Sequence, residues 1–259
     1  MENVIETKEN QLRAWFTRGK DPITKVIDGL DIGWGGVQRW ATGRMPPIED
    51  LHLDIACGYA TFLAQLGWRF PNAKLVGLNI DFSGPHRLAG SLLLEAGVRA
   101  TLVRADARRV PFPCNTFNSL SCFLGLQDIE IGFGWSGVRE SIIEAVRVVR
   151  ERGLMILLDE YPFSQFKEIL HDLPVEVLDF SERTLDSQWT QEIAEKAIEL
   201  YARGWVAQAR HSKGEDQEQT YTQIYQRMQK DLEEQLSSKG YFIPFGPIRM
   251  LTLRKTSRK

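Results

Sequence analysis

The stretch Leu51-His52-Leu53-Asp54-Ile55-Ala56-Cys57-Gly58-Tyr59-Ala60 is an apolar run that ends in small residues. It predicts a strand over 51–55, a tight turn, and a helix that begins at Thr61. Small residues let a ligand approach the backbone closely, and the first N–H groups of the new helix face that ligand. The stretch therefore predicts a ligand site at the carboxyl end of the first strand.

Asp54 narrows the chemistry of that ligand. A dinucleotide's pyrophosphate suits the N–H groups of the helix, but a carboxylate beside them repels it. A ligand that carries both an anion and a cation suits the whole site. The methionine end of S-adenosylmethionine has a carboxylate, an ammonium and a sulfonium, so Asp54 favours this molecule over a nicotinamide dinucleotide.

Composition and charge set limits on the class of protein. The chain has 259 residues, 43% of them hydrophobic and 25% charged, with a formal net charge of −2. These values are typical of one large globular domain and do not indicate a nucleic-acid partner. Three cysteines without a CxxC pair imply neither a metal site nor a disulfide framework, and they fit a reducing cytoplasm.

Targeting signals are not evident in the sequence. The amino-terminal residues are polar and lack the apolar core of a secretory signal. No apolar run reaches the ~18 residues that a membrane span needs. We therefore expect a cytoplasmic protein that acts on a small-molecule acceptor; a homodimer is compatible with the sequence.

Short strands alternate with helices along the middle of the chain, which predicts an α/β fold with a parallel sheet covered on both faces. The expected strands span 51–55, 74–79, 99–104, 119–123 and 154–159, and the expected helices span 61–69, 85–96 and 139–149. An earlier short helix is expected over 11–18. After Pro162 the pattern predicts a helix over 163–171, a short extended piece over 175–178, long helices over 190–209 and 218–238, and a strand over 248–253.

This alternation predicts four parts. Residues 1–47 form an amino-terminal cap or lid, and residues 48–162 form the ligand-binding α/β core. Residues 163–216 are expected to be a helical insertion that covers the acceptor, because insertions after a late strand often cover the crevice. Residues 217–259 supply the last helix and the closing strands of the core.

Three further stretches end the next predicted strands. They read Val76-Gly77-Leu78-Asn79-Ile80-Asp81, Val103-Arg104-Ala105-Asp106-Ala107, and Ser121-Cys122-Phe123-Leu124-Gly125-Leu126-Gln127-Asp128-Ile129. Together with the first stretch they resemble, in order, the motifs of class I S-adenosylmethionine-dependent methyltransferases. The resemblance is strongest to the small-molecule branch typified by ubiquinone/menaquinone methyltransferases. It covers residues 48–160, with weaker agreement over 240–255.

The resemblance implies a role for the first turn. Asp54 would organise the methionine ammonium of the cofactor, and the backbone of Ala56, Cys57 and Gly58 would flank the methionine. The family has glycine where this chain has Ala56 and Ala60, and an alanine cannot freely take a positive φ.

The resemblance also implies contacts to the nucleoside. Asn79, with Ile80, would lie beside the ribose in place of the family's acidic residue. Asp81 has two interpretations, as a second ribose contact or as a helix N-cap, and the N-cap is the commoner role. Asp106 would accept a hydrogen bond from the adenine amino group, with Ala105 and Ala107 beside it.

The fourth stretch concerns the acceptor side. By resemblance, Phe123 and Leu124 would flank the methionine, and Gln127 and Asp128 are the first candidates for acceptor contacts. We assign no catalytic residue, because the resemblance implies none that members share. Trp34 would either close over the cofactor or pack an amino-terminal cap.

The fold implied is a Rossmann-like, doubly wound sheet of seven strands in the order 3-2-1-4-5-7-6, with the last strand antiparallel. The function implied is methyl transfer from S-adenosylmethionine, by in-line displacement, to a small and partly apolar acceptor. Two alternatives remain open at this point. One is a non-catalytic protein that binds the cofactor or a partner, and the other is a nicotinamide-dependent dehydrogenase.

Overall fold

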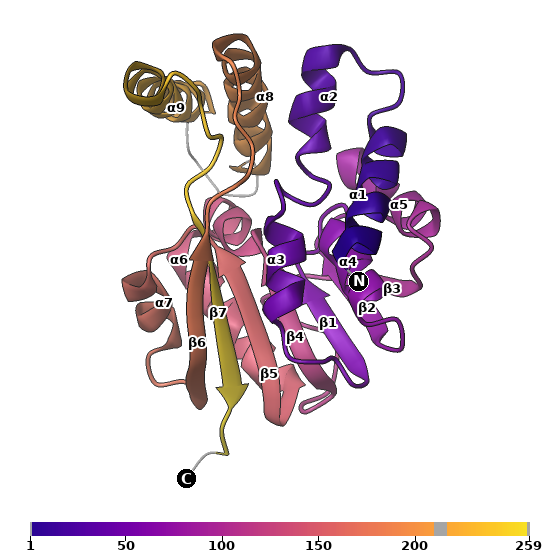
Figure 1. Ribbon diagram of the computed structural model, residues 1–259. Coiled ribbons are helices and arrows are strands. Elements are labelled where there is room, and N and C mark those ends of the chain that lie inside the picture. The colour runs from indigo at the N-terminus through magenta and orange to yellow at the C-terminus, as the bar shows by residue number, and fades with distance from the viewer. Residues whose placement is uncertain (1, 210–216, 258–259) are drawn as a thin grey trace.

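A seven-stranded sheet forms the centre of the protein (Figure 1). The structure is a computed structural model that describes residues 2–209 and 217–257. The strands are β1 (Leu51–Ile55), β2 (Lys74–Asn79), β3 (Ala100–Arg104), β4 (Phe117–Phe123), β5 (Val149–Asp159), β6 (Val175–Arg183) and β7 (Ile248–Lys255). Their order across the sheet is β3-β2-β1-β4-β5-β7-β6. β7 runs antiparallel to β5 and β6, whereas β1 to β5 are parallel. The predicted fold class and strand order are confirmed.

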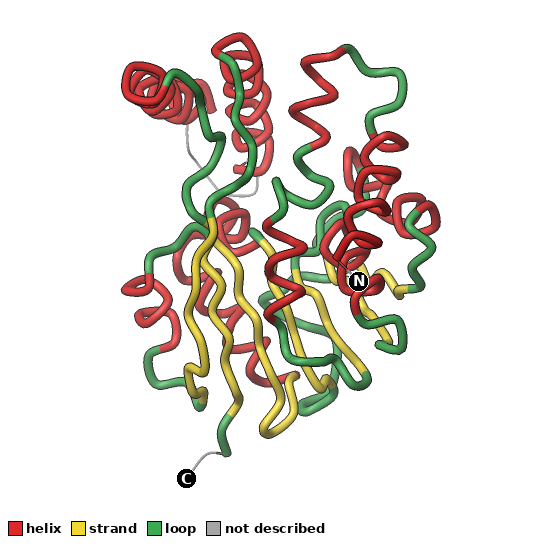
Figure 2. The backbone as a smooth tube through the Cα atoms, in the orientation of Figure 1, coloured by secondary structure: helices red, strands yellow, loops and turns green. Residues whose placement is uncertain are grey.

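Helices cover both faces of this sheet, and some of them extend past the ends of its strands (Figure 2). They are α1 (Glu2–Phe16), α2 (Pro22–Gly29), α3 (Val37–Arg44), α4 (Thr61–Arg69), the 3-10 helix η1 (Gly84–Leu88), α5 (Ala89–Glu95), α6 (Gly125–Val148), α7 (Phe163–Leu170), α8 (Gln191–Ala209) and α9 (Gln217–Lys239). In Figure 1, α2, α8 and α9 stand beyond the carboxyl ends of the parallel strands.

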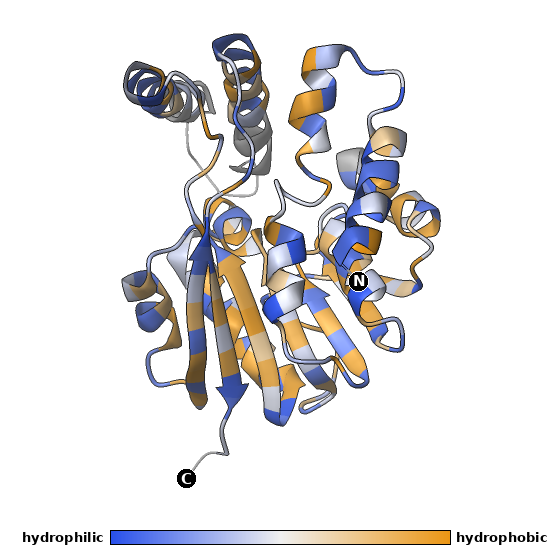
Figure 3. Ribbon diagram, in the orientation of Figure 1, coloured by the Kyte–Doolittle hydropathy of each residue, from blue (hydrophilic) through white to orange (hydrophobic). Residues whose placement is uncertain are grey.

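Alternating residues of each strand face two different helical layers, because successive side chains of a strand point to opposite faces. Leu53 and Ile55 of β1 belong to a buried cluster with residues of α6 and α7. The opposite face packs against a second cluster that includes residues of α3 and α4. Figure 3 shows hydrophobic residues concentrated on the central strands. On the α4 face, however, β1 carries His52 and Asp54, both buried polar residues.

Two helices begin earlier than the sequence predicts. α1 begins at Glu2, not near residue 11, and it buries Ile5, Glu9, Leu12 and Phe16. These residues have helical spacing, but a glutamate interrupts the apolar stripe and conceals it. α6 begins at Gly125, not near residue 139, and is bent at Gly134, where φ is 69°. The helical pieces before and after this bend do not share one apolar stripe, so the sequence pattern does not predict them as a single helix.

The segment 163–216 contributes more than helices. Its strand β6 forms the edge of the sheet by pairing with β7, and it extends to Arg183, well beyond the predicted piece at 175–178. α8 leaves the sheet and packs beside α9. Residues 210–216 of the predicted insertion lie outside the described residues.

Candidate functional site

The turn after β1 adopts a left-handed backbone conformation at three positions. The φ angles are 54° at Ala56, 50° at Gly58 and 65° at Ala60. Both alanines therefore take the conformation that the family reserves for glycine, at a cost of roughly 1–2 kcal/mol each. Gly125 makes room for this turn, because a Cβ built there would lie 2.5 Å from the Cβ of Ala56. Strain held at a turn is typical of a ligand site.

Asp54 lies near the end of β1, just before this turn, and one of its carboxylate oxygens has no hydrogen-bond partner. Its side chain is 1% exposed. Oδ1 accepts a hydrogen bond of 2.5 Å from the Ser121 hydroxyl, whereas Oδ2 is buried and has no partner within the protein. Burial raises the pKa of Asp54 to about 7, and the hydrogen bond from Ser121 partly offsets this rise. An unpaired buried oxygen is costly, so the carboxylate fits a ligand that brings a positively charged donor.

The end of β2 is arranged around Asn79. Its amide donates to the carbonyl of Asp81 over 2.6 Å and lies 3.2 Å from Nδ1 of His86. His86 packs edge-on against Tyr59 of the turn, and a Cβ at Gly58 would lie 3.7 Å from its Nε2. Ile80 is 42% exposed beside Asn79. Asp81 accepts hydrogen bonds from the backbone and hydroxyl of Ser83. The N-cap of η1 is Ser83, so the expected N-cap role of Asp81 is wrong, and Asp81 instead closes a turn before the helix.

The end of β3 places Asp106 beside a cation. Arg108 donates to both carboxylate oxygens, the shortest bond being 2.6 Å from Nη2 to Oδ2. Burial alone would raise the pKa of Asp106, but the hydrogen bonds and charge of Arg108 outweigh it and lower that pKa. Ala105 donates its N–H to the carbonyl of Asn79 over 3.0 Å, and Ala107 is buried. Asp106 is therefore ionised and held at the same edge of the sheet as Asp54 and Asn79.

An aromatic group gathers at the end of β4. The Phe123 ring stacks on Phe62 of α4 at 4.9 Å and contacts Trp34 at 5.9 Å between ring centroids. Trp34 in turn contacts Phe245, which contacts Tyr201 of α8. Leu124 follows with φ at 54°, immediately before α6. Four segments far apart in sequence thus bring aromatic side chains to the end of β4, including the amino-terminal segment and α8.

The two candidate acceptor contacts lie at the start of α6. Gln127 is half-buried, and its amide donates to Glu160 over 3.2 Å. Asp128 is exposed. The helix itself is fixed by Asp159, whose Oδ2 accepts from the backbone N–H groups of Leu126 and Gln127 at 3.1 and 3.4 Å. Burial raises the pKa of Asp159 to about 8.

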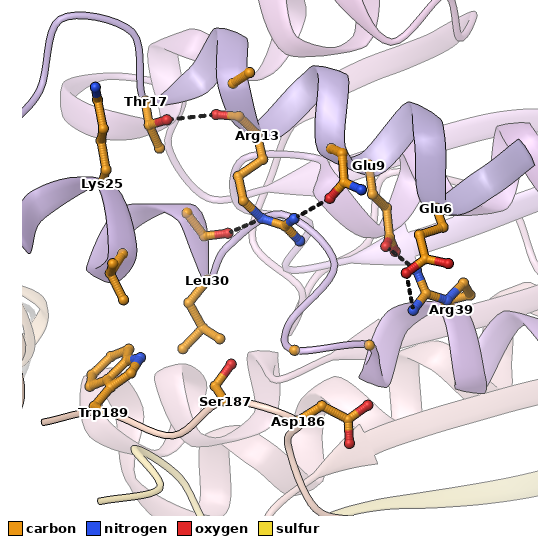
Figure 4. Close-up of a pocket in the computed structure, with 16 residues that line it drawn as sticks. Glu6, Glu9, Arg13, Thr17, Lys25, Leu30, Arg39, Asp186, Ser187 and Trp189 are labelled. Atoms are coloured by element: carbon orange, nitrogen blue, oxygen red, sulfur yellow. Dashed lines mark hydrogen bonds and ion pairs between the residues drawn. The ribbon is translucent and has the colours of Figure 1, made fainter. Parts of the chain in front are cut away.

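A cavity of about 660 Å³ opens elsewhere, between α1, α2 and the segment 186–189 (Figure 4). Both arginines on its wall already have partners. Arg39 pairs with Glu9 at 2.5 Å and Glu6 at 3.7 Å, and Arg13 donates to the carbonyls of Gly29 and Ile32. Among the described residues that line this cavity, none belongs to the predicted cofactor site.

Ser121 also belongs to the site, although it is not among the site residues predicted from the sequence. The available signal was a pair of polar residues with period two, Ser119 and Ser121, in an otherwise apolar strand. His52, two residues before Asp54 on the same strand, is also buried. Asp159 was also missed, because its role depends on the proximity of β5 and α6.

The strand order and the helices on both faces of the sheet give this protein a Rossmann-like fold. Residues 53–157 match the family described as a methyltransferase domain. This match confirms the resemblance to the class I S-adenosylmethionine-dependent enzymes. The small-molecule branch within that class stays a prediction. No curated protein matches the chain.

Solved structures with the same fold share little sequence with this chain. A proposed methyltransferase from Bacillus halodurans is 14% identical, with 86% of this chain and 99% of that one covered and a TM-score of 0.55. A proposed sarcosine dimethylglycine methyltransferase from Galdieria sulphuraria is also 14% identical, with 97% and 98% covered and a TM-score of 0.53. The cyclase SpnF is 16% identical, with 87% and 81% covered and a TM-score of 0.53. These similarities show the fold.

Within the described ranges, no helix is long and apolar enough to cross a membrane.

Buried carboxyl groups predict an unusual dependence of stability on pH. Burial raises the pKa of Asp54 to about 7 and that of Asp159 to about 8. The folded protein therefore keeps protons that the unfolded chain has released, so the free energy of unfolding falls as pH rises through these values. Chemical denaturation at pH 6.5 and 8.5 should show a loss of about 3 kcal/mol. Asp54→Asn should reduce this loss; a stability that rises over the same interval would contradict these assignments.

Proposed function

We propose that this protein transfers a methyl group from S-adenosylmethionine to a small, partly apolar acceptor. The observation that carries the proposal is the buried, unpartnered Oδ2 of Asp54, which lies just before a strained turn at the carboxyl end of β1. A zwitterion with an ammonium group fits this carboxylate and the N-terminus of α4, whereas a diphosphate does not.

Different residues of the site would contact different parts of the cofactor. Asp54 would hold the ammonium, the backbone of Ala56, Cys57 and Gly58 would flank the methionine, and Phe123 and Leu124 would lie on its other side. Asn79 and Ile80 would lie along the ribose, and Asp106, with Ala105 and Ala107, would meet the adenine. S-adenosylmethionine, when bound, supplies a methyl group that already carries a good leaving group.

The aromatic group at the end of β4 supports an apolar acceptor. Trp34, Phe62 and Phe123 would exclude water from the site, and an aromatic ring near the sulfonium would attract its positive charge. The protein's contribution is alignment in a dry site. Gln127 and Asp128 are proposed as acceptor contacts. Residues 1–47 and 163–216 are proposed as the covering parts, since Trp34 and Tyr201 both reach the aromatic group.

One alternative has specific support. Asp106 is already paired with Arg108, and Asn79 replaces an acidic residue, so this chain has less free negative charge for the nucleoside than the family pattern implies. A protein that binds the cofactor without transferring its methyl group is compatible with these features. The SpnF cyclase, by its description, carries out another reaction on this fold.

Ligand-dependent melting tests the proposal. S-adenosylmethionine and S-adenosylhomocysteine should raise the melting temperature, and NAD should not, because a ligand that binds only the folded state stabilises it. Stabilisation by NAD alone would contradict the proposal. Methyl-labelled S-adenosylmethionine, incubated with small-molecule fractions of a cell extract, should then yield labelled product. Binding without any transfer of label would favour the non-catalytic alternative.

A further inference from the structure

A line of buried polar side chains leads to Asp54 from within the sheet. In the register of β1 against β4, His52 lies opposite Ser119 and Asp54 lies opposite Ser121. All four side chains are 0–5% exposed. The two ring nitrogens of His52 lie 2.8 Å from the Ser119 hydroxyl and 2.9 Å from the Ser121 hydroxyl. The four residues therefore form one continuous chain of hydrogen bonds.

The number of available protons fixes the direction of these bonds. A serine hydroxyl has one proton, and Ser121 donates it to Oδ1 of Asp54 over 2.5 Å. The Ser121 oxygen must then accept from His52 Nε2–H, which leaves Nδ1 bare to accept from Ser119. Burial lowers the pKa of His52 to about 3, so the ring is neutral. Each hydrogen bond in this row of four side chains is therefore donated in the direction of Asp54.

We propose that Ser119, His52 and Ser121 form a relay that positions the Asp54 carboxylate, keeping Oδ1 bonded and Oδ2 free for the cofactor's ammonium. This inference rests on the proposed function. The relay supplies an aligned row of neutral dipoles, which stabilises a carboxylate and strengthens each bond in the row. Ser121 and His52 are positioning residues, because they act through Asp54.

Other titratable groups around Asp54 do not replace this role. The thiols of Cys57 and Cys122 are close enough for the charge of Asp54 to act on them, and burial raises the pKa of both. Beyond Cys122 lies Asp159, which is bonded to the start of α6. His86 lies across the turn near Gly58, and burial lowers its pKa. Asp54 is the carboxylate in this group that has an unpartnered buried oxygen.

The relay should set the pH at which the cofactor site becomes competent. Wild-type affinity for S-adenosylhomocysteine should fall as pH decreases through about 7, where Asp54 takes up a proton. The bond from Ser121 lowers the pKa of Asp54, so its loss in Ser121→Ala should move the midpoint upward by about 1–2 pH units. At pH 7 the affinity should then fall about tenfold.

Calorimetric titration of the full-length protein with S-adenosylhomocysteine, from pH 5.5 to 9, tests this inference. His52→Leu should shift the midpoint in the same direction, and His52→Gln, which keeps a donor, should restore it. Ser141→Ala is the matched control, because Ser141 is equally buried but bonds within α6 to Gly137. Equal midpoints in wild type, Ser121→Ala and Ser141→Ala would overturn the relay.

A second readout does not depend on affinity. Nitrogen-15 NMR should show His52 as the neutral Nε2–H tautomer with no titration between pH 5 and 9, its signals being assigned by their loss in His52→Gln. An Nδ1–H tautomer, or titration near pH 6.5, would overturn the relay even if the ligand binds. No binding by wild type at any pH would overturn the proposed function and the role of the relay together.

Discussion

Replacing Asp54 with alanine is expected to reduce the affinity for S-adenosylhomocysteine about 30-fold or more, since truncating one partner of a buried charge pair costs roughly 2–5 kcal/mol. The free oxygen of Asp54 is the buried negative group beside the turn that can meet the ligand's ammonium. Without it, the ammonium would be buried with no counter-charge. The measurement is isothermal titration calorimetry at pH 8, where Asp54 is ionised.

The fold should survive this substitution. Burial raises the pKa of Asp54, so the ionised carboxylate destabilises the free protein at pH 8, and Asp54→Ala should melt at or above the wild-type temperature. Asp50→Ala is the control, because Asp50 is exposed at the opposite end of β1 and pairs with Lys74. Wild-type affinity in a folded Asp54→Ala variant would contradict the assigned site.

Replacing Glu9 with alanine is expected to destabilise the protein by about 3 kcal/mol, the lower part of the range for removing one partner of a buried ion pair. Glu9 is 2% exposed, although it lies on the amino-terminal helix. It accepts from Arg39 of α3 over 2.5 Å and from the buried amide of Gln65 of α4. Its loss leaves Gln65 without a partner, whereas Arg39 keeps Glu6 at 3.7 Å.

Chemical denaturation measures this effect, and Glu6→Ala is the matched control. Glu6 lies on the same helix and contacts the same arginine, but its side chain is 55% exposed, so we expect a change of less than about 0.5 kcal/mol. α1 should also detach more readily from α4 in the Glu9 variant, which hydrogen exchange over residues 2–16 would detect. Equal stability of the two variants would show that Glu9 does not anchor α1.

The sequence predicts the sheet better than the helices around it. β1, β2 and α4 have the predicted bounds, because short apolar runs bounded by Gly, Pro and Asn identify them locally. The first turns of α1 remain hidden because Glu9 interrupts the apolar face, and its burial depends on Arg39 and Gln65, which come much later in the chain. The strand β6 is longer than expected because pairing with β7 orders residues whose own pattern is mostly polar.

The residues of the candidate site, too, are predictable only where the sequence signal is local. Asp54 and Gly58 are recognisable because the turn that they need is local. The link from Ser121 to Asp54 is not, since it depends on the register of β1 against β4, strands separated by more than sixty residues. The sequence also gives no indication that Arg108 donates hydrogen bonds to the carboxylate of Asp106. This contact depends on the conformation of the backbone after β3, which brings the two side chains together.

The most direct test of the central claim is a crystal structure of the protein with S-adenosylhomocysteine. We expect the ligand's amino nitrogen within hydrogen-bonding distance of Asp54 Oδ2, with its carboxylate toward the turn and the start of α4. A ligand bound instead in the cavity between α1 and α2, with Asp54 Oδ2 still unpartnered, would contradict the account.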